Sequence, residues 1–171
     1  MQNILPSGID RQTQNTFSTL VDGYKKTELI GNAGLALFRM EAILVDRAEP
    51  SESLTANTVW SCGLENACYL LSSKQLEEIR TGKTAQPETE AKGVRGAFFA
   101  CANVELSVDG FKEWYFVSEV NQDVVDIINL VDFIENTKDI PSVLEADVEK
   151  GTLALRNIVG QADGIQETAD E

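Results

Sequence analysis

The strongest folding signal in this chain is an Asp-Gly pair that separates two runs of apolar residues. Apolar and polar residues alternate from Val104 to Asp109, and an aromatic-rich run returns from Phe111 to Val120. An Asp-Gly pair between two such runs is typical of a tight β-turn, because both of its residues tolerate positive φ. The sequence therefore predicts an antiparallel β-hairpin over residues 101–120.

Two stretches before this hairpin show apolar residues at the i, i+3, i+4, i+7 spacing of an amphipathic helix. The first spans residues 28–47 and the second spans residues 54–80. In the second stretch, Trp60, Leu64, Ala67 and Leu71 fall on one helical face, which would pack on the first helix. We therefore predict an N-terminal helical hairpin.

The first of these predicted helices is apolar on two opposite sides. A helix of this kind is normally buried on both sides, either inside a core or against another subunit. A later predicted helix also carries apolar residues on its outer side. We therefore expect a homodimer, with a dimer or packing interface formed by Leu35, Phe38, Val45, Val125 and Phe133.

Two more helices are predicted after the β-hairpin. Apolar spacing predicts one helix from about Asn121 to Asn136, and the Ser142-x-x-Glu145 pair has the spacing of a capping box that opens another. The predicted class is therefore α+β, with an N-terminal helical hairpin, an antiparallel β-hairpin and two C-terminal helices. We expect a helical scaffold over residues 1–80, a polar loop over 81–93, and the β-hairpin with its helices over 94–159, in the same domain or a subdomain. A disordered tail is predicted over 160–171, because it holds few large apolar residues.

The chain contains no histidine, which restricts the chemistry it can perform. Histidine-based acid-base catalysis, Ser-His-Asp and Cys-His nucleophile pairs, and metal sites that need an imidazole are all excluded. The cysteines, Cys62, Cys68 and Cys101, have no CxxC spacing, so we expect them to be reduced core residues. With no phosphate-binding, dinucleotide-binding or calcium-loop motif either, we predict a protein that is not an enzyme and has no catalytic residue, metal or cofactor.

Acidic residues outnumber basic ones by 28 to 14, and the excess is concentrated in the second half of the chain. Residues 1–99 hold 12 acids and 10 bases, whereas residues 100–171 hold 16 acids and 4 bases. This balance argues against nucleic acid or an anionic membrane as a direct partner. We expect a basic protein partner instead, bound by acids that lie largely at helical spacing: Glu119, Asp123, Asp126, Asp132, Glu135 and Asp139.

The leading hypothesis is a non-enzymatic acidic protein-binding module, such as an inhibitor or immunity-type protein that caps a basic partner. Two alternatives stay open. The chain could be an oligomeric structural or assembly protein whose acidity only keeps it soluble, or a nucleic-acid mimic whose carboxylates imitate a row of phosphates. The first residues have no basic or apolar signal segment, and no apolar run approaches the roughly 18 residues of a membrane span, so we expect a cytoplasmic protein.

Overall fold

The structure, a computed structural model, describes residues 21–31, 33–41 and 54–161. The chain divides into two compact units, residues 1–135 and residues 136–171. The first unit combines antiparallel sheets with helices, which confirms the predicted α+β class.

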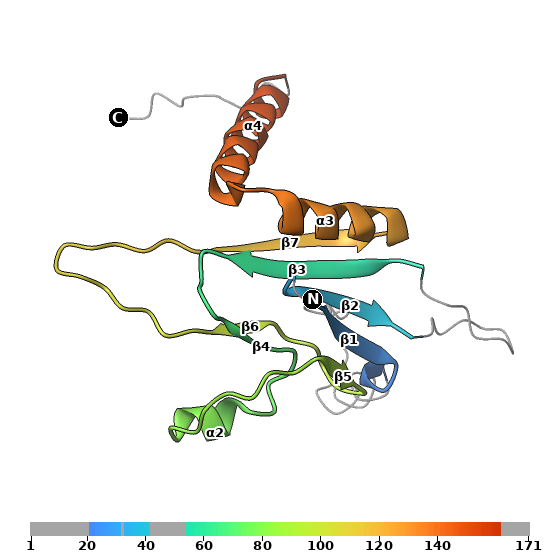
Figure 1. The fold of residues 1–171 in the computed structure, drawn as a ribbon. Helices are drawn as coiled ribbons and strands as arrows, with labels where there is room; N and C mark the ends of the chain where they lie inside the picture. Colours follow the sequence, from blue (N-terminus) through green and yellow to red (C-terminus); the bar gives the residue numbers. More distant parts are fainter. Residues whose placement is uncertain (1–20, 32, 42–53, 162–171) are drawn as a thin grey trace, which may run out of the picture. The chain divides into compact units, whose positions relative to one another are not determined.

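The first unit is organised around a five-stranded antiparallel sheet (Figure 1). The strand order is β5-β1-β2-β3-β7, so the last strand in sequence lies at one edge. These strands are β1 (Lys25–Ile30), β2 (Leu35–Met40), β3 (Ala56–Cys62), β5 (Glu90–Lys92) and β7 (Tyr115–Gln122).

One face of this sheet is covered by helix α3 (Val124–Asn136). Trp60 is almost fully buried on that face, and its ring lies 6.2 Å from the ring of Phe133, edge to face. Leu35 and Thr58 share the face and are fully buried, because alternate residues of neighbouring strands point the same way. Apolar burial under α3 therefore holds the centre of the sheet.

The opposite face packs on a two-stranded sheet of β4 (Cys68–Leu70) and β6 (Phe99–Cys101) and on the segments around it. Tyr69 stacks on Phe98, and Phe98 contacts Phe116 of β7. A second core lies beside these rings, formed by Ala36, Leu71 and Ala91 with Leu29, Phe38, Val94 and Phe98 around them. The short helix α2 (Leu76–Arg80) follows β4.

The predicted N-terminal helical hairpin is wrong over the described residues. The first stretch forms β1 and β2, and the second forms β3, β4 and α2. Leu35, Ala36, Leu37 and Phe38 are apolar at successive positions because both faces of the sheet are covered there, so the two-sided pattern resembles a helix. Gly34 marks the turn between the strands, with φ of +59° and a Cβ position only 2.8 Å from the Tyr69 ring.

The predicted β-hairpin over residues 101–120 is wrong in its strand pairing, and its turn lies one residue earlier than the predicted Asp109-Gly110 turn. The N–H of Gly110 donates to the carbonyl of Ser107 at 3.0 Å, and Asp109 has φ of +62°, so the central turn residues are Val108 and Asp109. The flanking strands pair elsewhere: β6 with β4, and β7 with β3. Val117 thus lies opposite Trp60, where it adds to the core under α3.

The two predicted C-terminal helices are confirmed as α3 and α4 (Ile140–Gln161). Helix α4 belongs to the second unit and continues through Gly151 without a break. The predicted polar loop over 81–93 ends in strand β5. The predicted tail over 160–171 is wrong at its start, because residues 160 and 161 belong to α4, and it lies outside the described residues from 162 onward.

Candidate functional site

Among the described residues of the first unit, the two most exposed large apolar side chains lie on residues 102–114, which we call the arm. The arm joins β6 to β7 and contains no strand or helix (Figure 1). Val108 is 94% exposed and Phe111 is 84% exposed, at and just after the turn. The large apolar side chains that the arm exposes are Val104, Leu106, Val108, Phe111 and Trp114.

The arm is anchored where it rejoins the sheet. Lys112 pairs with Glu65 at 3.0 Å, and a Cβ at Gly63 would lie 2.5 Å from the carbonyl oxygen of Glu113. The backbone of the arm therefore passes directly over Gly63, which has room only for a hydrogen. A shallow hollow of about 260 Å³ lies at this point, lined by Lys112, Glu113, Trp114 and Tyr115.

The exposed apolar surface continues from the arm onto β7. Phe116 is 54% exposed and Val120 is 68% exposed, on the face opposite α3. Within the described sheet, β7 pairs only with β3, so its other edge has no strand partner there. Strand β7 contains no lysine or proline, which often protect a sheet edge from pairing with another chain, although Glu119 and a register irregularity opposite Ala56–Thr58 interrupt this edge.

Asp123 and Asp126, two of the six acids predicted to bind a partner, form the N-terminal cap of α3. The Asp123 carboxylate accepts from the N–H of Val125 at 2.7 Å and of Asp126 at 3.0 Å. The Asp126 carboxylate accepts in return from the N–H of Asp123 at 3.0 Å. This reciprocal arrangement is a capping box, so both carboxylates have a structural role in starting the helix.

The other four acids lie on three elements: β7, α3 and the start of α4. Asp139 caps α4 in the second unit, where its carboxylate accepts from the N–H and the hydroxyl of Ser142. Glu119 is exposed on β7 opposite Thr58, while Asp132 and Glu135 are exposed on α3. Three of the six acids predicted to bind a partner, Asp123, Asp126 and Asp139, therefore cap helices.

The predicted interface residues are distributed between core and surface. Leu35 is fully buried within the sheet, Phe38 packs on the second core, and Phe133 contacts Trp60. Val125 is 63% exposed on α3. Val45 lies outside the described residues.

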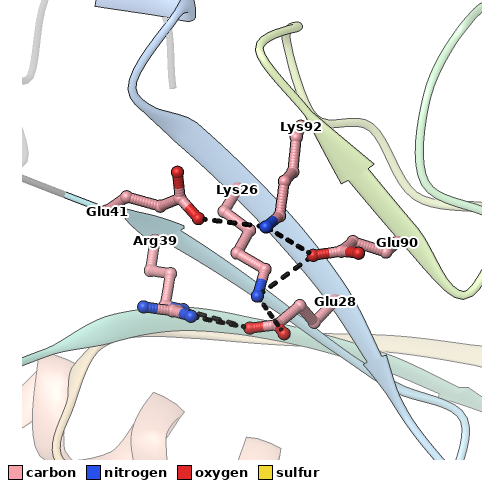
Figure 2. A network of polar contacts seen from close by, with 6 residues as sticks. All are labelled: Lys26, Glu28, Arg39, Glu41, Glu90 and Lys92. Atoms are coloured by element: carbon pink, nitrogen blue, oxygen red, sulfur yellow. Dashed lines mark hydrogen bonds and ion pairs between the residues drawn. The ribbon is translucent and has the colours of Figure 1, made fainter.

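A network of ion pairs occupies the part of the sheet that lies beyond α3, toward β5 (Figure 2). It consists of Lys26, Glu28, Arg39, Glu41, Glu90 and Lys92. The register places Glu28 opposite Glu90 and Lys26 opposite Lys92, so like charges face each other directly. Diagonal pairs offset this repulsion, such as Lys26 with Glu90 at 3.0 Å and Arg39 with Glu28 at 3.1 Å.

The carboxylate pKa values in this network respond to these contacts. Burial acts to raise the pKa of Glu28, but hydrogen bonds from Lys26 and Arg39 outweigh it and hold the pKa below its usual value. Hydrogen bonds from Lys26 and Lys92 lower the pKa of Glu90. Each cation of the network is paired with a carboxylate, which fits a structural role better than ligand binding.

The described residues contain no cluster of three or more cysteine, aspartate or glutamate side chains that could hold a metal ion. No helix among them is long and apolar enough to cross a membrane. No protein-family model matches the chain, and no curated protein matches it either.

The exposure of the arm was not evident from the alternating pattern, which predicts a half-buried hairpin. One signal in the sequence does point to it: Val104, Leu106, Val108 and Phe111 surround a turn, where polar residues are expected. Apolar side chains so close to a turn have little of their own chain to pack against.

Proposed function

We propose that this chain is a non-enzymatic protein-binding module that contacts a basic partner protein through the arm. The observation that carries the proposal is the exposure of five large apolar side chains on a segment without strand pairing. Full burial of one such side chain contributes about 1.5–3 kcal/mol, so leaving five in water is unfavourable unless something covers them. A partner protein with an apolar groove would do so.

The charges around the arm support a basic rim on that partner. Glu105, Asp109 and Glu113 lie on the arm and Glu119 lies on the adjoining strand, all of them exposed. The single cation of the arm, Lys112, is paired with Glu65. A partner groove lined by apolar residues and bordered by lysine or arginine would complement both properties, and its charge would accelerate association.

The test is capture of binding proteins from an extract of the organism that encodes the chain. A triple variant, L106S with V108S and F111S, removes exposed apolar groups without touching the core. We expect the amount of partner captured by this variant to fall at least ten-fold, while its circular dichroism melt stays close to that of the wild type. Capture by the wild type should also weaken as salt is raised, because the charge contribution is screened.

The matched control is V143S with V148S, which removes two exposed apolar side chains from α4. This variant should capture the partner as the wild type does. Equal capture by the arm variant and the control would refute the proposal, and so would the absence of any specific partner for the wild type. Replacing Glu105, Glu113 and Glu119 by glutamine tests the charge separately, since it should lower the association rate more than it raises the dissociation rate.

A second candidate function is self-assembly, in which another copy of the chain covers the arm. The unpaired edge of β7 favours it, because an edge strand without lysine or proline can pair with the same strand of a second copy. This candidate corresponds to the oligomeric structural or assembly protein that the sequence leaves open.

A further inference from the structure

Two of the three cysteines lie directly opposite each other at the base of the arm. In the β4–β6 ribbon, Cys68 is paired in register with Cys101, and Tyr69 and Leu70 follow with Ala100 and Phe99. Both thiols are free and both side chains are partly exposed. Cys101 is also the last residue before the arm begins.

This register brings the two cysteines within reach of a disulfide bond. Directly opposed residues of an antiparallel pair have Cα atoms about 4.5 or 5.5 Å apart, depending on the hydrogen-bonding pattern. A disulfide spans Cα separations of about 4.4–6.8 Å, so either spacing is compatible with the bond. Opposed residues also project to the same face of the ribbon, which directs the two sulfur atoms to one side.

The surroundings of Cys68 favour its protonated thiol over the thiolate. Burial raises the pKa of the Cys68 thiol, and the nearby Cys101 and Glu88 raise it further. The Cys68 thiol is placed 3.8 Å from the carbonyl oxygen of Ala85, to which it can donate. The Cys68 thiol therefore stays protonated at neutral pH and reacts faster as the pH rises, because the thiolate is the nucleophile.

We propose that Cys68 and Cys101 form a redox-active pair that closes to a disulfide by exchange with a small-molecule disulfide such as oxidised glutathione. One cysteine thiolate attacks a sulfur of the small disulfide and releases one small thiolate, which leaves a mixed disulfide on the protein. The opposed thiolate then attacks the protein-side sulfur and releases the second small thiolate. The two cysteines lose two electrons and two protons in total, and the small disulfide is reduced to two thiols.

The bond would act on the base of the arm. It would join β4 to β6 covalently, so that Cys101, the last residue before the arm, could no longer separate from β4. It would also close a loop from residue 68 to residue 101, which restricts the unfolded chain and stabilises the fold. Formation of the pair does not depend on the function proposed above for the arm.

The test is incubation of the folded full-length chain with oxidised glutathione at about pH 8, followed by alkylation and mass spectrometry. Trypsin places Cys62 and Cys68 in one peptide, residues 48–74, and Cys101 in another, residues 96–112. The assignment therefore uses the Cys62→Ser variant, in which a link between the two peptides can only join Cys68 to Cys101. We expect this link in most molecules and a rise in Tm of about 5 °C or more, reversed by a dithiol reductant.

Two further variants serve as matched controls. Cys68→Ser and Cys101→Ser should form no link between the peptides and should keep a glutathione adduct on the remaining thiol of the pair. A Cys62→Ser protein that stays folded by circular dichroism and forms no link would overturn the proposal. A link that appears in the wild type but is lost in Cys62→Ser would also overturn it, because it would identify Cys62 as the partner of Cys101.

Discussion

At the residue scale, Glu88 shows how a polar side chain can hold a loop in place. Its carboxylate accepts from the N–H of Leu71 at 2.8 Å, from the hydroxyl of Ser72 at 3.2 Å and from the amide of Gln75 at 2.8 Å. These contacts join the end of β4 and the start of α2 to the segment that leads into β5. In the sequence, Glu88 is one acid among many in a polar stretch, and only the fold reveals its partners.

The contacts of Glu88 predict a pH-dependent contribution to stability. Burial acts to raise its pKa, but the hydrogen bonds from Gln75, Leu71 and Ser72 outweigh burial and lower the pKa below the usual 4.5. A carboxyl with a lowered pKa in the folded state stabilises the fold above its unfolded pKa, and that stability is lost as pH falls through the folded value. We therefore expect Glu88→Gln to destabilise the protein above about pH 5, by an amount that shrinks toward about pH 3.

Urea unfolding of the wild type and Glu88→Gln across this pH range measures the effect. Glu105→Gln is the control, because Glu105 is exposed on the arm and should leave the free energy of unfolding nearly unchanged. A difference between wild type and Glu88→Gln that stays constant from about pH 6 to pH 3 would contradict the interpretation.

At the element scale, the structure depends on which faces of each strand or helix are covered. Strand β2 is covered on both faces at its start, where Leu35 and Ala36 are fully buried and Ala36 belongs to the second core. Helix α3 is covered on one side only: Leu130 and Phe133 are partly buried, whereas Val124, Val125 and Ile128 are each more than 60% exposed. Among the described residues, the ring contact between Phe133 and Trp60 is therefore the apolar anchor that joins α3 to the sheet.

This anchor predicts unequal effects for two truncations on the same helix. Phe133→Ala should lower the free energy of unfolding by about 2–3 kcal/mol, because it removes a partly buried ring and its edge-to-face contact. Val125→Ala should change it by less than about 0.5 kcal/mol, since that side chain is mostly in water. Urea unfolding followed by tryptophan fluorescence, in a Trp114→Phe background so that Trp60 alone reports, and by circular dichroism measures both, and equal losses would show that Phe133 is not the anchor.

At the scale of the whole molecule, acidity and apolar exposure occur in the same half of the chain. Of the 28 acids, 16 lie after residue 99, and the same region contains the arm and the exposed apolar residues of α3 and α4. Charge of one sign keeps such a surface from aggregating while a specific partner can still cover it. The acids that cap helices show, however, that not every carboxylate in this half is available for a partner.

The self-assembly candidate makes a prediction at this scale. If a second copy covers the arm and the β7 edge, light scattering on a gel-filtration peak should give twice the 18.7 kDa of one chain. The variant L106S with V108S and F111S should then give the mass of a single chain at the same concentration. A wild-type mass near 18.7 kDa at high protein concentration would exclude self-assembly and leave a different protein as the partner.

The sequence by itself determined the features that depend on local chemistry. The α+β class, α3 and α4, and a turn that includes Asp109 all follow from spacing and turn propensity over a few residues, and the absence of histidine excludes whole classes of site. Only the tertiary structure decided that Leu35–Met40 is a strand, that β7 pairs with β3, and that the arm is left in water. These outcomes depend on contacts between residues far apart in the chain, because a segment covered on both sides shows the same apolar pattern whether it is a strand or a helix. The sequence also does not predict the pairing of Cys68 with Cys101, because the two residues lie 33 positions apart and become neighbours only across the β4–β6 ribbon.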